Sequence, residues 1–519
     1  MGRQRLTISK KQFTRLRSVA FIGLALLVWY MFLLHPDQTS GSSLAATVEF
    51  NDIPSGSAKK PPQREQLPPE LLNNRLMTSQ QCADTFPGIT KEIDDAVAKG
   101  PFTLTKTSEL GPLLARIKDG KLYILQSTRR ADLSEEMLQH RSASLHQIAA
   151  ALLTAPHPSE VPDTVFALNY RDEPAETSFS YSRPADPALN KPSRGYFPMP
   201  HFSFWSWPLP FIGSFPRAAA AIRDLEDGNE NGNDTTALPV PPLSWHDKDP
   251  RAVWRGTAHF NNVRAGRMRQ ELLRTAAGRP WSDIEPLRWT DGGADARNAL
   301  AVEDFCRHRY VVHTEGITYS GRFQFHQLCA SVVLTPPLAW MQHLTHLVRP
   351  VFSYDLPSLA AAVDGDGEKK SSSDSTKPAA TTTIERKLRT PKIYDNGVHE
   401  KLRLAPYPAP WVKQAWPRSY HDSVDDDDQG PNMVFVAPDW SDLEGVVAWL
   451  EAHPRAAEGI AWRQRALFHG RGYFSPAAEM CYWRAALRGW ARAVRYGDDV
   501  AALGVGVPWE EFSLKEMHR

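Results

Sequence analysis

The first 34 residues divide into a basic segment and an apolar segment. Residues 1–17 contain no acid but six bases: Arg3, Arg5, Lys10, Lys11, Arg15 and Arg17. Residues 19–34 are uncharged and mostly apolar. A membrane span needs about 20 apolar residues, although the thinner early-secretory membrane accommodates a shorter run. The basic flank predicts a cytosolic tail over 1–17 and a transmembrane signal anchor over 18–34, with the rest of the chain in the lumen.

A cleaved signal peptide is the alternative interpretation of this N-terminus. The basic region is long for a signal peptide, and no small-residue cleavage pattern follows Leu34 directly. The anchor is therefore the preferred prediction.

Polar segments without periodicity interrupt the rest of the chain. Residues 35–80 are rich in Ser and Pro, which predicts a flexible stem. Two further segments, 364–391 and 421–431, indicate disordered insertions between ordered elements. Asn233 lies in loop-like sequence and begins the glycosylation sequon Asn-Asp-Thr, which a lumenal enzyme can use.

Between these segments, short apolar runs alternate with helical patterns. Residues 165–168, 309–313 and 332–335 predict strands. Ser441-x-x-Glu444 resembles a capping box, and Ser475 followed by Pro476 predicts the start of a last helix that runs to about Val494. Alternation of this kind is typical of parallel βαβ units, so the predicted fold class is α/β.

Composition narrows the classes of function. A chain of 519 residues with 42% hydrophobic residues and 16 Trp is large enough for about two globular domains. The formal net charge of +1 disfavours nucleic acid as a partner. The four Cys lack the close pairs of a zinc site, and an oxidising lumen would allow them to pair with one another.

Residues 306–323 carry the most informative chemistry. A strand leads into a Gly-containing loop, and Ser320 lies where it would cap a following helix. The N-terminus of such a helix attracts anions, whereas its dipole disfavours Arg322 in the first turn. A bound diphosphate would compensate Arg322, and a surface arginine paired with a carboxylate is the alternative. Arg255 and Gly256 follow a second predicted strand and give a weaker signal of the same kind.

Several motifs along the chain, taken together, resemble glycosyltransferase family 90, which includes capsule-associated glycosyltransferases and protein O-glucosyltransferases of the endoplasmic reticulum. They read, in order, Cys82-Ala-Asp-Thr-Phe-Pro87, Asn169-Tyr-Arg-Asp172, Met199-Pro-His-Phe-Ser-Phe-Trp-Ser-Trp-Pro208, Trp254-Arg-Gly256, Tyr319-Ser-Gly-Arg-Phe323 and Ala477-Ala-Glu-Met-Cys-Tyr-Trp-Arg484.

The resemblance implies a GT-B-like fold, in which two Rossmann-like domains face a cleft. The expected bounds are 81–240 for the acceptor-side domain, 241–470 for the donor-binding domain, 471–496 for a C-terminal helix that packs back across the domains, and 497–519 for a tail. The resemblance further implies that Arg255 and Arg322 hold the diphosphate of a UDP-sugar, that Gly256, Ser320 and Gly321 line the same site, and that no metal or other cofactor is required.

The disulfide pairing is also implied by the resemblance. A bridge at the positions of Cys306 and Cys329 recurs in the glucosyltransferase relatives, which leaves Cys82 and Cys481 as the second pair.

Two residues are candidates for the general base. Asp172 ends a predicted strand, and His201 stands where capsule-associated relatives carry aspartate after Met-Pro. Both side chains can accept a proton near neutral pH, and both have a structural interpretation as well, Asp172 in a turn and His201 in the wall of a cleft.

Other features carry less weight. The acidic run 425–428 has no preceding strand, so a solvated linker is preferred over a metal-binding motif, and His343 and His346 lack a third ligand. The aromatic residues of 202–207 suit either an acceptor sugar or the core. Walker-type and G-x-S-x-G loops are absent from the sequence.

The sequence therefore predicts a single-pass type II membrane glycosyltransferase of the Golgi or endoplasmic reticulum. It would transfer a sugar, xylose or glucose, from a UDP-sugar to a hydroxyl group of a glycan or glycoprotein. The alternative is a membrane-tethered, glycan-binding pseudoenzyme that keeps the fold, which the departure at His201 brings into consideration.

Overall fold

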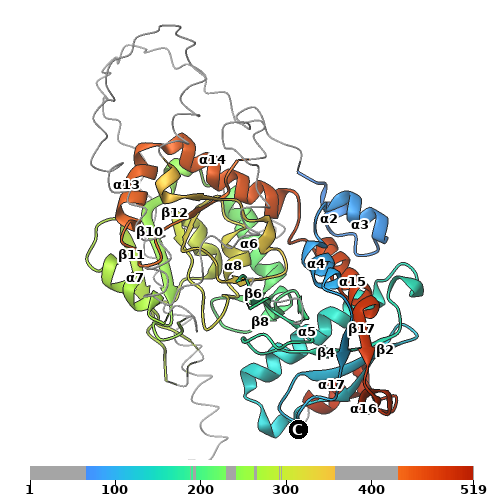
Figure 1. Cartoon of the computed structure of the whole chain (residues 1–519). Helices are drawn as coiled ribbons and strands as arrows, with labels where there is room; N and C mark the ends of the chain where they lie inside the picture. Colours follow the sequence, from blue (N-terminus) through green and yellow to red (C-terminus); the bar gives the residue numbers. More distant parts are fainter. Residues whose placement is uncertain are drawn as a thin grey trace, which may run out of the picture. The chain divides into compact units, whose positions relative to one another are not determined.

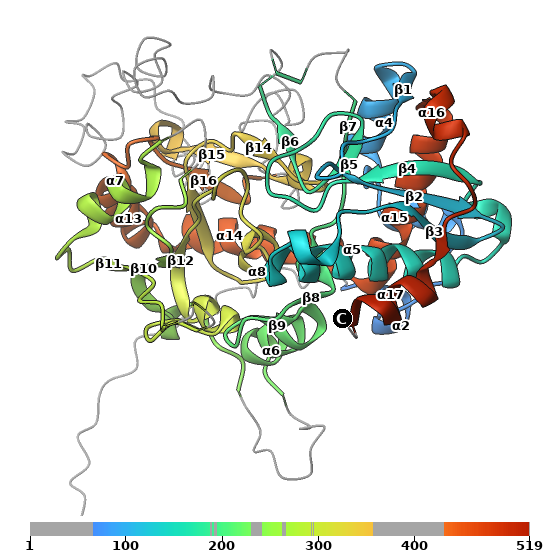
Figure 2. The same cartoon turned by 90° about the horizontal axis from the view of Figure 1, so that it is seen from below.

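The computed structural model (Figure 1) describes most of the chain beyond residue 65, namely 66–186, 189–190, 195–229, 241–261, 266–291, 293, 295–356 and 430–517. Two six-stranded sheets organise this part of the chain, and Figure 2 shows strands of both sheets together with their helices. The fold is mixed α/β with Rossmann-like parallel strands, in agreement with the predicted class.

The first sheet is mixed, with strand order β18-β3-β2-β4-β5-β7. Its strands are β2 (Leu113–Lys118), β3 (Lys121–Gln126), β4 (Thr164–Leu168), β5 (Ser178–Ser180), β7 (Tyr196–Pro198) and β18 (Val507–Pro508). Strands β4, β5 and β7 are parallel neighbours, whereas β2 is antiparallel to β3 and β4, and β18 is antiparallel to β3. The predicted Rossmann-like character of the N-terminal domain therefore holds only for its parallel part.

A tight turn explains the antiparallel pair β2–β3. Asp119 and Gly120 both adopt positive φ, 50° and 71°, and Lys118 pairs with Lys121 across them. Two central residues of positive φ define the two-residue hairpin turn whose twist suits antiparallel strands, and Asp-Gly is a preferred pair for it.

Helices α5 (Glu135–Leu153) and α15 (Pro476–Ala493) contact this sheet and each other. Helix α15 begins as predicted, with the Ser475 hydroxyl accepting a hydrogen bond from the Ala478 N–H. Its residues Trp483 and Trp490 are fully buried, and both rings contact Phe179 of β5. The predicted last helix thus becomes part of the core of the first half.

The C-terminal segment is not a tail, which corrects the expectation for 497–519. Strand β18 pairs with β3, α16 covers Asp498–Ala501 and α17 covers Trp509–Met517. Trp509 is buried against the ring of His146. Removing an apolar side chain such as that of Trp509 from water stabilises this folded segment. The segment was not predicted to fold, because its sequence has no clear hydrophobic periodicity.

The expected flexible stem is also shorter than 35–80, because residues 66–80 are folded. Helix α2 covers Pro69–Leu72, and the Leu67 N–H donates to the Gly470 carbonyl over 3.0 Å. Met77 is fully buried, and Thr78 forms a capping box with Gln81 at the start of α3 (Ser79–Thr85). Residues 35–65 lie outside the described part.

The second sheet is wholly parallel, with strand order β11-β10-β12-β13-β16-β15. Its strands are β10 (Asp249–Gly256), β11 (Ser282–Pro286), β12 (His308–Val312), β13 (Val332–Thr335), β15 (Pro350–Phe352) and β16 (Met433–Phe435). Separate apolar clusters bury the two faces of the central strands. Strands buried on both faces read as continuous apolar runs, which is why β12 and β13 were predictable to within a residue.

Helices α7 (Met268–Ala276), α13 (Leu443–Ala452) and α14 (Pro454–Arg465) belong to the second half. The expected capping box at Ser441 is wrong, because Asp442 occupies the N-cap position of α13 and its carboxylate accepts from the Ala437 N–H instead.

The described chain also contains several shorter elements, among them α4 (Lys91–Ala98), β1 (Phe102–Leu104), β6 (Arg183–Pro184), η3 (Phe202–Phe204), β8 (Ser206–Trp207), β9 (Gly213–Ser214), α6 (Phe215–Asp227), η5 (Val302–Arg307), α8 (Phe323–His326), β14 (Trp340–Met341), a π-helical turn (Ala466–Gly470) and β17 (Val494–Tyr496). The antiparallel pair β6–β14 joins the two halves.

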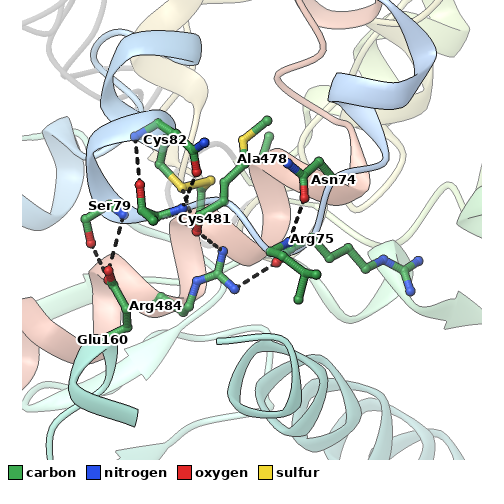
Figure 3. The surroundings of a disulfide bond; sticks show 12 residues. Asn74, Arg75, Ser79, Cys82, Glu160, Ala478, Cys481 and Arg484 are labelled. Carbon is green, nitrogen blue, oxygen red and sulfur yellow. Dashed lines mark hydrogen bonds between the residues drawn. A yellow bond between two sulfur atoms is a disulfide. The ribbon is translucent and has the colours of Figure 1, made fainter. Parts of the chain in front are cut away.

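Both expected disulfides are present. Cys306 and Cys329 are bonded with Cα atoms 5.0 Å apart, and Cys82 and Cys481 with Cα atoms 5.6 Å apart. Figure 3 shows the second bridge beside two polar contacts, Ser79 with Glu160 and Arg484 with the Arg75 carbonyl. This bridge fastens α3 to α15, and the other fastens the segment before β12 to the segment before β13.

Several predictions lie outside the described residues: the signal anchor 18–34, the insertion 364–391, most of the insertion 421–431, and Asn233. Across the part that the structure describes, no helix is both long enough and apolar enough for a membrane crossing.

Candidate active site

The loop that follows β12 lies at the carboxyl edge of the second sheet. Open parallel sheets bind ligands at this edge. The Gly316 N–H donates to the Tyr319 carbonyl over 2.8 Å, and a side chain at Gly316 would lie 2.9 Å from that same oxygen. The loop also contacts the first half of the fold, because the Thr318 hydroxyl donates to the Asp172 carbonyl over 2.7 Å. It therefore lies where the two halves meet.

The helix after this loop differs from the expectation. Helix α8 has four residues, Arg322 rather than Ser320 is its N-cap, and no side chain caps it. A single turn develops little dipole, so the predicted helix-terminus contribution to anion binding is wrong. Any attraction for an anion must come from side chains.

Arg322 supplies such a charge. Its guanidinium donates to the Arg255 carbonyl and lies over the Phe305 ring, with 5.6 Å from Cζ to the ring centroid. Within the described part of the chain it forms no ion pair with a carboxylate, and burial lowers its pKa to about 10. Arg322 is therefore not a surface arginine paired with any carboxylate that the structure describes. A buried cation without an anion is costly, so a bound anion would stabilise it.

Arg269 is a second cation at the same place, and the sequence analysis missed it. It is 5% exposed, donates to the carbonyls of Glu315 and Thr257 over 3.1 and 2.9 Å, and lies over the Trp254 ring. Burial, followed by the charge of Arg322, lowers the pKa of Arg269 to about 9. The two guanidinium groups therefore repel each other in a site where neither forms an ion pair with a described carboxylate.

A signal for Arg269 was present in the sequence. It lies in the first turn of α7, where the helix dipole disfavours a cation, and α7 follows the Trp254-Arg255-Gly256 strand end. The argument made for Arg322 applies equally to this position.

Arg255 lies beside Arg322, and both line one small cavity with Phe305. Four of its five N–H donors are already used: by the Asp283 carboxylate and carbonyl, each over 2.7 Å, by the Trp254 carbonyl, and by the Asn298 carbonyl. Arg255 thus fastens β11 to β10, and its charge is compensated by Asp283. Gly256 has no room for a side chain, because a Cβ atom would lie 2.5 Å from the Trp254 ring.

Gly321 lies against His201, and Ser320 precedes it in the same loop. A Cβ atom on Gly321 would lie 2.3 Å from the His201 ring, so only glycine permits this approach. The His201 ring also packs edge-on against Tyr181 and Tyr319. The structure therefore brings the predicted residues His201, Gly321 and Arg322 into one region.

The protonation of His201 is fixed by its partners. Its Nδ1 accepts a hydrogen bond from the Ser203 backbone N–H over 3.2 Å, so the proton of the neutral ring resides on Nε2. Burial lowers the pKa of His201 well below its usual range. A ring that already carries its Nε2 proton and resists a second one is a poor proton acceptor, which favours the structural interpretation of His201 as part of the wall.

Asp172, unlike His201, has the partial exposure and the pKa that suit a general base. It follows β4 and is only partly buried. Burial, and then the charge of Glu136, raise the pKa of Asp172 to about 6. The nearby Tyr319 hydroxyl opposes this rise, although it makes no hydrogen bond of normal geometry. A carboxylate with a pKa just below neutrality is a suitable general base.

The aromatic residues of 202–207 have divided roles. Phe202 and Phe204 are buried in the core, as one interpretation expected. Trp205 is 44% exposed and stacks on His146 with ring centroids 5.0 Å apart. Trp207 packs edge-on against His201.

Metal ligation has little support among the described side chains. The cluster with suitable spacing there is Glu226 with Cys306 and Cys329, and both sulfurs belong to a disulfide. His343 and His346 are buried and packed separately, His343 against Tyr482 and His346 on the Gly88 carbonyl. The acidic run 425–428 lies outside this part of the chain.

The carboxyl edge of this parallel sheet carries two arginines without described carboxylate partners, which suits an anionic ligand. The loop at the same edge is bonded to the Asp172 carbonyl of the first half. Comparison with protein families gives the assignment: the model of glycosyl transferase family 90 matches residues 78–399, more than half of the chain, and the chain belongs to that family. A search of curated proteins finds no match. The family makes the protein a glycosyltransferase, which uses a nucleotide-sugar donor and a glycan acceptor, and the resemblance noted in the sequence is confirmed.

Proposed function

We propose that this glycosyltransferase binds a UDP-sugar in a GT-B-like cleft and transfers the sugar, xylose or glucose, to a hydroxyl group of a glycan or glycoprotein. One observation carries the proposal: Arg269 and Arg322 lie at the carboxyl edge of a parallel sheet, and neither is paired with a described carboxylate. A nucleoside diphosphate provides the charge and the bidentate geometry that guanidinium groups accept.

In the proposed reaction, the acceptor hydroxyl oxygen attacks the anomeric carbon of the donor sugar. The bond from that carbon to the diphosphate oxygen breaks, and Asp172 takes the hydroxyl proton. The charge that develops on the leaving UDP is stabilised by Arg269 and Arg322, which do for the diphosphate what a divalent cation does in other glycosyltransferases. We propose that no metal is required for this step.

The donor is testable by thermal stabilisation. Because a ligand that binds only the folded state raises stability by RT ln(1 + [L]/Kd), a UDP-sugar at 100 times its Kd should contribute about 2.7 kcal/mol. We expect UDP-xylose or UDP-glucose to raise the melting temperature of the purified chain, and ADP-glucose and GDP-mannose to raise it less. Equal shifts with all four donors, or none, would contradict the proposed donor.

The pseudoenzyme alternative predicts the same stabilisation without turnover. Measuring the release of UDP from the stabilising donor, with and without a glycan acceptor, distinguishes an active enzyme from a pseudoenzyme. The raised pKa of Asp172, which suits a general base, favours the enzyme.

We also propose a type II topology, with the folded part in the lumen of the Golgi or endoplasmic reticulum. The basic tail 1–17 before the apolar run 18–34 supports this orientation. Protease added to sealed microsomes should remove only the tail and leave the body intact. Digestion of the body before detergent is added would refute the orientation.

A further inference from the structure

His313 is the first residue after β12 and lies at the ligand-binding edge of the second sheet. It is 2% exposed, and its backbone N–H donates to the Leu334 carbonyl over 2.9 Å, which holds it to the neighbouring strand β13. Its ring packs on Phe323 and edge-on against His326, with centroids 4.4 and 5.9 Å away. None of the roles derived above uses this side chain.

Three buried imidazole nitrogens at this position lack hydrogen-bond partners among the described residues. Nδ1 of His313 and both ring nitrogens of His326 are buried, and none forms a hydrogen bond within the described part of the chain. Buried polar atoms are nearly always bonded, so an orphaned group beside a candidate site indicates a partner that arrives with the ligand.

The charges that face His313 are mostly positive. Burial, then Arg322, then Arg269, lower the pKa of His313 to about 3. His326 is also neutral, because burial and the same arginine lower its pKa well below the usual range. The nearest loop acid, Glu315, uses its carboxylate on the N–H groups of Ala339 and Trp340. His313 is thus kept neutral first by its burial and then by the two cations that lack described anions.

We propose that His313 takes up a proton from solvent when a diphosphate binds between Arg269 and Arg322, and that the imidazolium then donates a hydrogen bond to the diphosphate. This rests on the proposed donor site. The anion offsets the two positive charges that exclude the proton from the ring, so the proton affinity of His313 rises in the complex.

Linkage gives the sign of the pH dependence. If binding of the diphosphate raises the affinity of His313 for a proton, then a proton raises the affinity for the diphosphate by the same factor. Affinity should therefore increase as the pH falls through the pKa of His313 in the complex, by at most about tenfold per pH unit for one proton.

His313 is preferred over His326 because of where each lies. His313 follows the strand end directly, whereas His326 is inside α8 with its ring against Phe305. His326 is therefore the matched control, being equally buried and close to the same arginine.

Isothermal titration calorimetry of the full chain tests the proposal. UDP-glucose and UDP-xylose are the probes, since both phosphates of a nucleotide-sugar are esterified and do not titrate near neutral pH. Binding is measured at about pH 6, within the ordinary histidine range, in two buffers of different ionisation enthalpy. The dependence of the observed heat on the buffer gives the number of protons taken up.

We expect measurable uptake in the wild type, retained uptake in His326→Asn, and none in His313→Asn, which still binds. Asp172→Asn should also retain uptake, which separates His313 from the other group that titrates near this pH. His313→Gln serves as a second variant if His313→Asn fails to fold. Zero uptake in the wild type, or unchanged uptake in a folded His313 variant, overturns the proposal.

Results that contradict the proposed function differ from results that contradict only the role of His313. If UDP-sugars do not bind but GDP-mannose or ADP-glucose does, the donor is wrong and proton uptake is measured with the ligand that binds. Binding of a UDP-sugar without uptake leaves the donor site intact and removes only the role of His313. If none of these diphosphates binds, both proposals fall.

Discussion

Replacing Arg322 by alanine should weaken UDP binding by at least roughly 100-fold, because a hydrogen bond to a charged group contributes about 1.5–3 kcal/mol and one guanidinium can make two of them. Arg322→Lys should recover only part of this loss, since a point charge does not reproduce the planar fork. Titration calorimetry gives both values. Arg309→Ala is the control, because Arg309 lies in the same sheet but is paired with Glu451.

The same substitution should leave the stability of the unliganded protein unchanged or raise it. Arg322 is a largely buried cation without a described counter-ion, so its removal relieves a desolvation cost. Arg183→Ala should do the opposite and cost about 3–5 kcal/mol, because it would leave the Glu92 carboxylate buried without its bidentate partner. An Arg322→Ala variant that folds, is destabilised and binds UDP normally would show that Arg322 is structural.

Asp172→Asn should lower turnover by about 10²- to 10⁴-fold with little change in donor affinity, because it removes the proton acceptor and keeps the shape. In the wild type, turnover should fall as the pH drops below about 6, where Asp172 becomes protonated. Glu136→Gln should move this limit to lower pH, since Glu136 raises the pKa of Asp172. Initial rates across pH, with UDP release as the signal, measure all three.

His201→Gln provides the contrast. His201 is buried, and its Nδ1 is bonded to the Ser203 N–H, so the substitution should affect packing more than proton transfer. A melting temperature that falls while the rate per folded molecule stays within a few-fold agrees with this assignment. Loss of turnover in His201→Gln together with normal rates in Asp172→Asn would exchange their roles.

The second sheet was the most predictable part of the fold, because its central strands are buried on both faces and read as apolar runs. The antiparallel pair β2–β3 also has a local sequence signal, because Asp119-Gly120 is a preferred pair for its hairpin turn. Strand β18 was beyond prediction, since Val507 and Pro508 form a strand only by pairing with β3 far earlier in the chain. Pairing over such a separation depends on tertiary contact and leaves no local pattern.

The candidate site likewise has residues that the sequence predicts and contacts that it does not. Arg322 was found from its position after a loop, whereas Arg269 was overlooked although its position in a first helical turn carried the same signal. The contact of His201 with Gly321 and the bond from Thr318 to Asp172 join segments more than a hundred residues apart, and no spacing in the sequence encodes them. The raised pKa of Asp172 follows first from its burial in that assembly and then from Glu136, and the chain neighbour Glu173 adds a smaller contribution.

The disulfide between Cys82 and Cys481 spans 399 residues, and β18 and α15 complete the first sheet from the far end of the chain. During translation, the second sheet has all its strands once Phe435 has emerged, so it is able to form early. The first half, although it begins the fold, lacks a covering helix, an edge strand and a disulfide partner until residues 476–508 have been made. The first sheet can therefore be completed only after residues 507–508 of β18 have been synthesised.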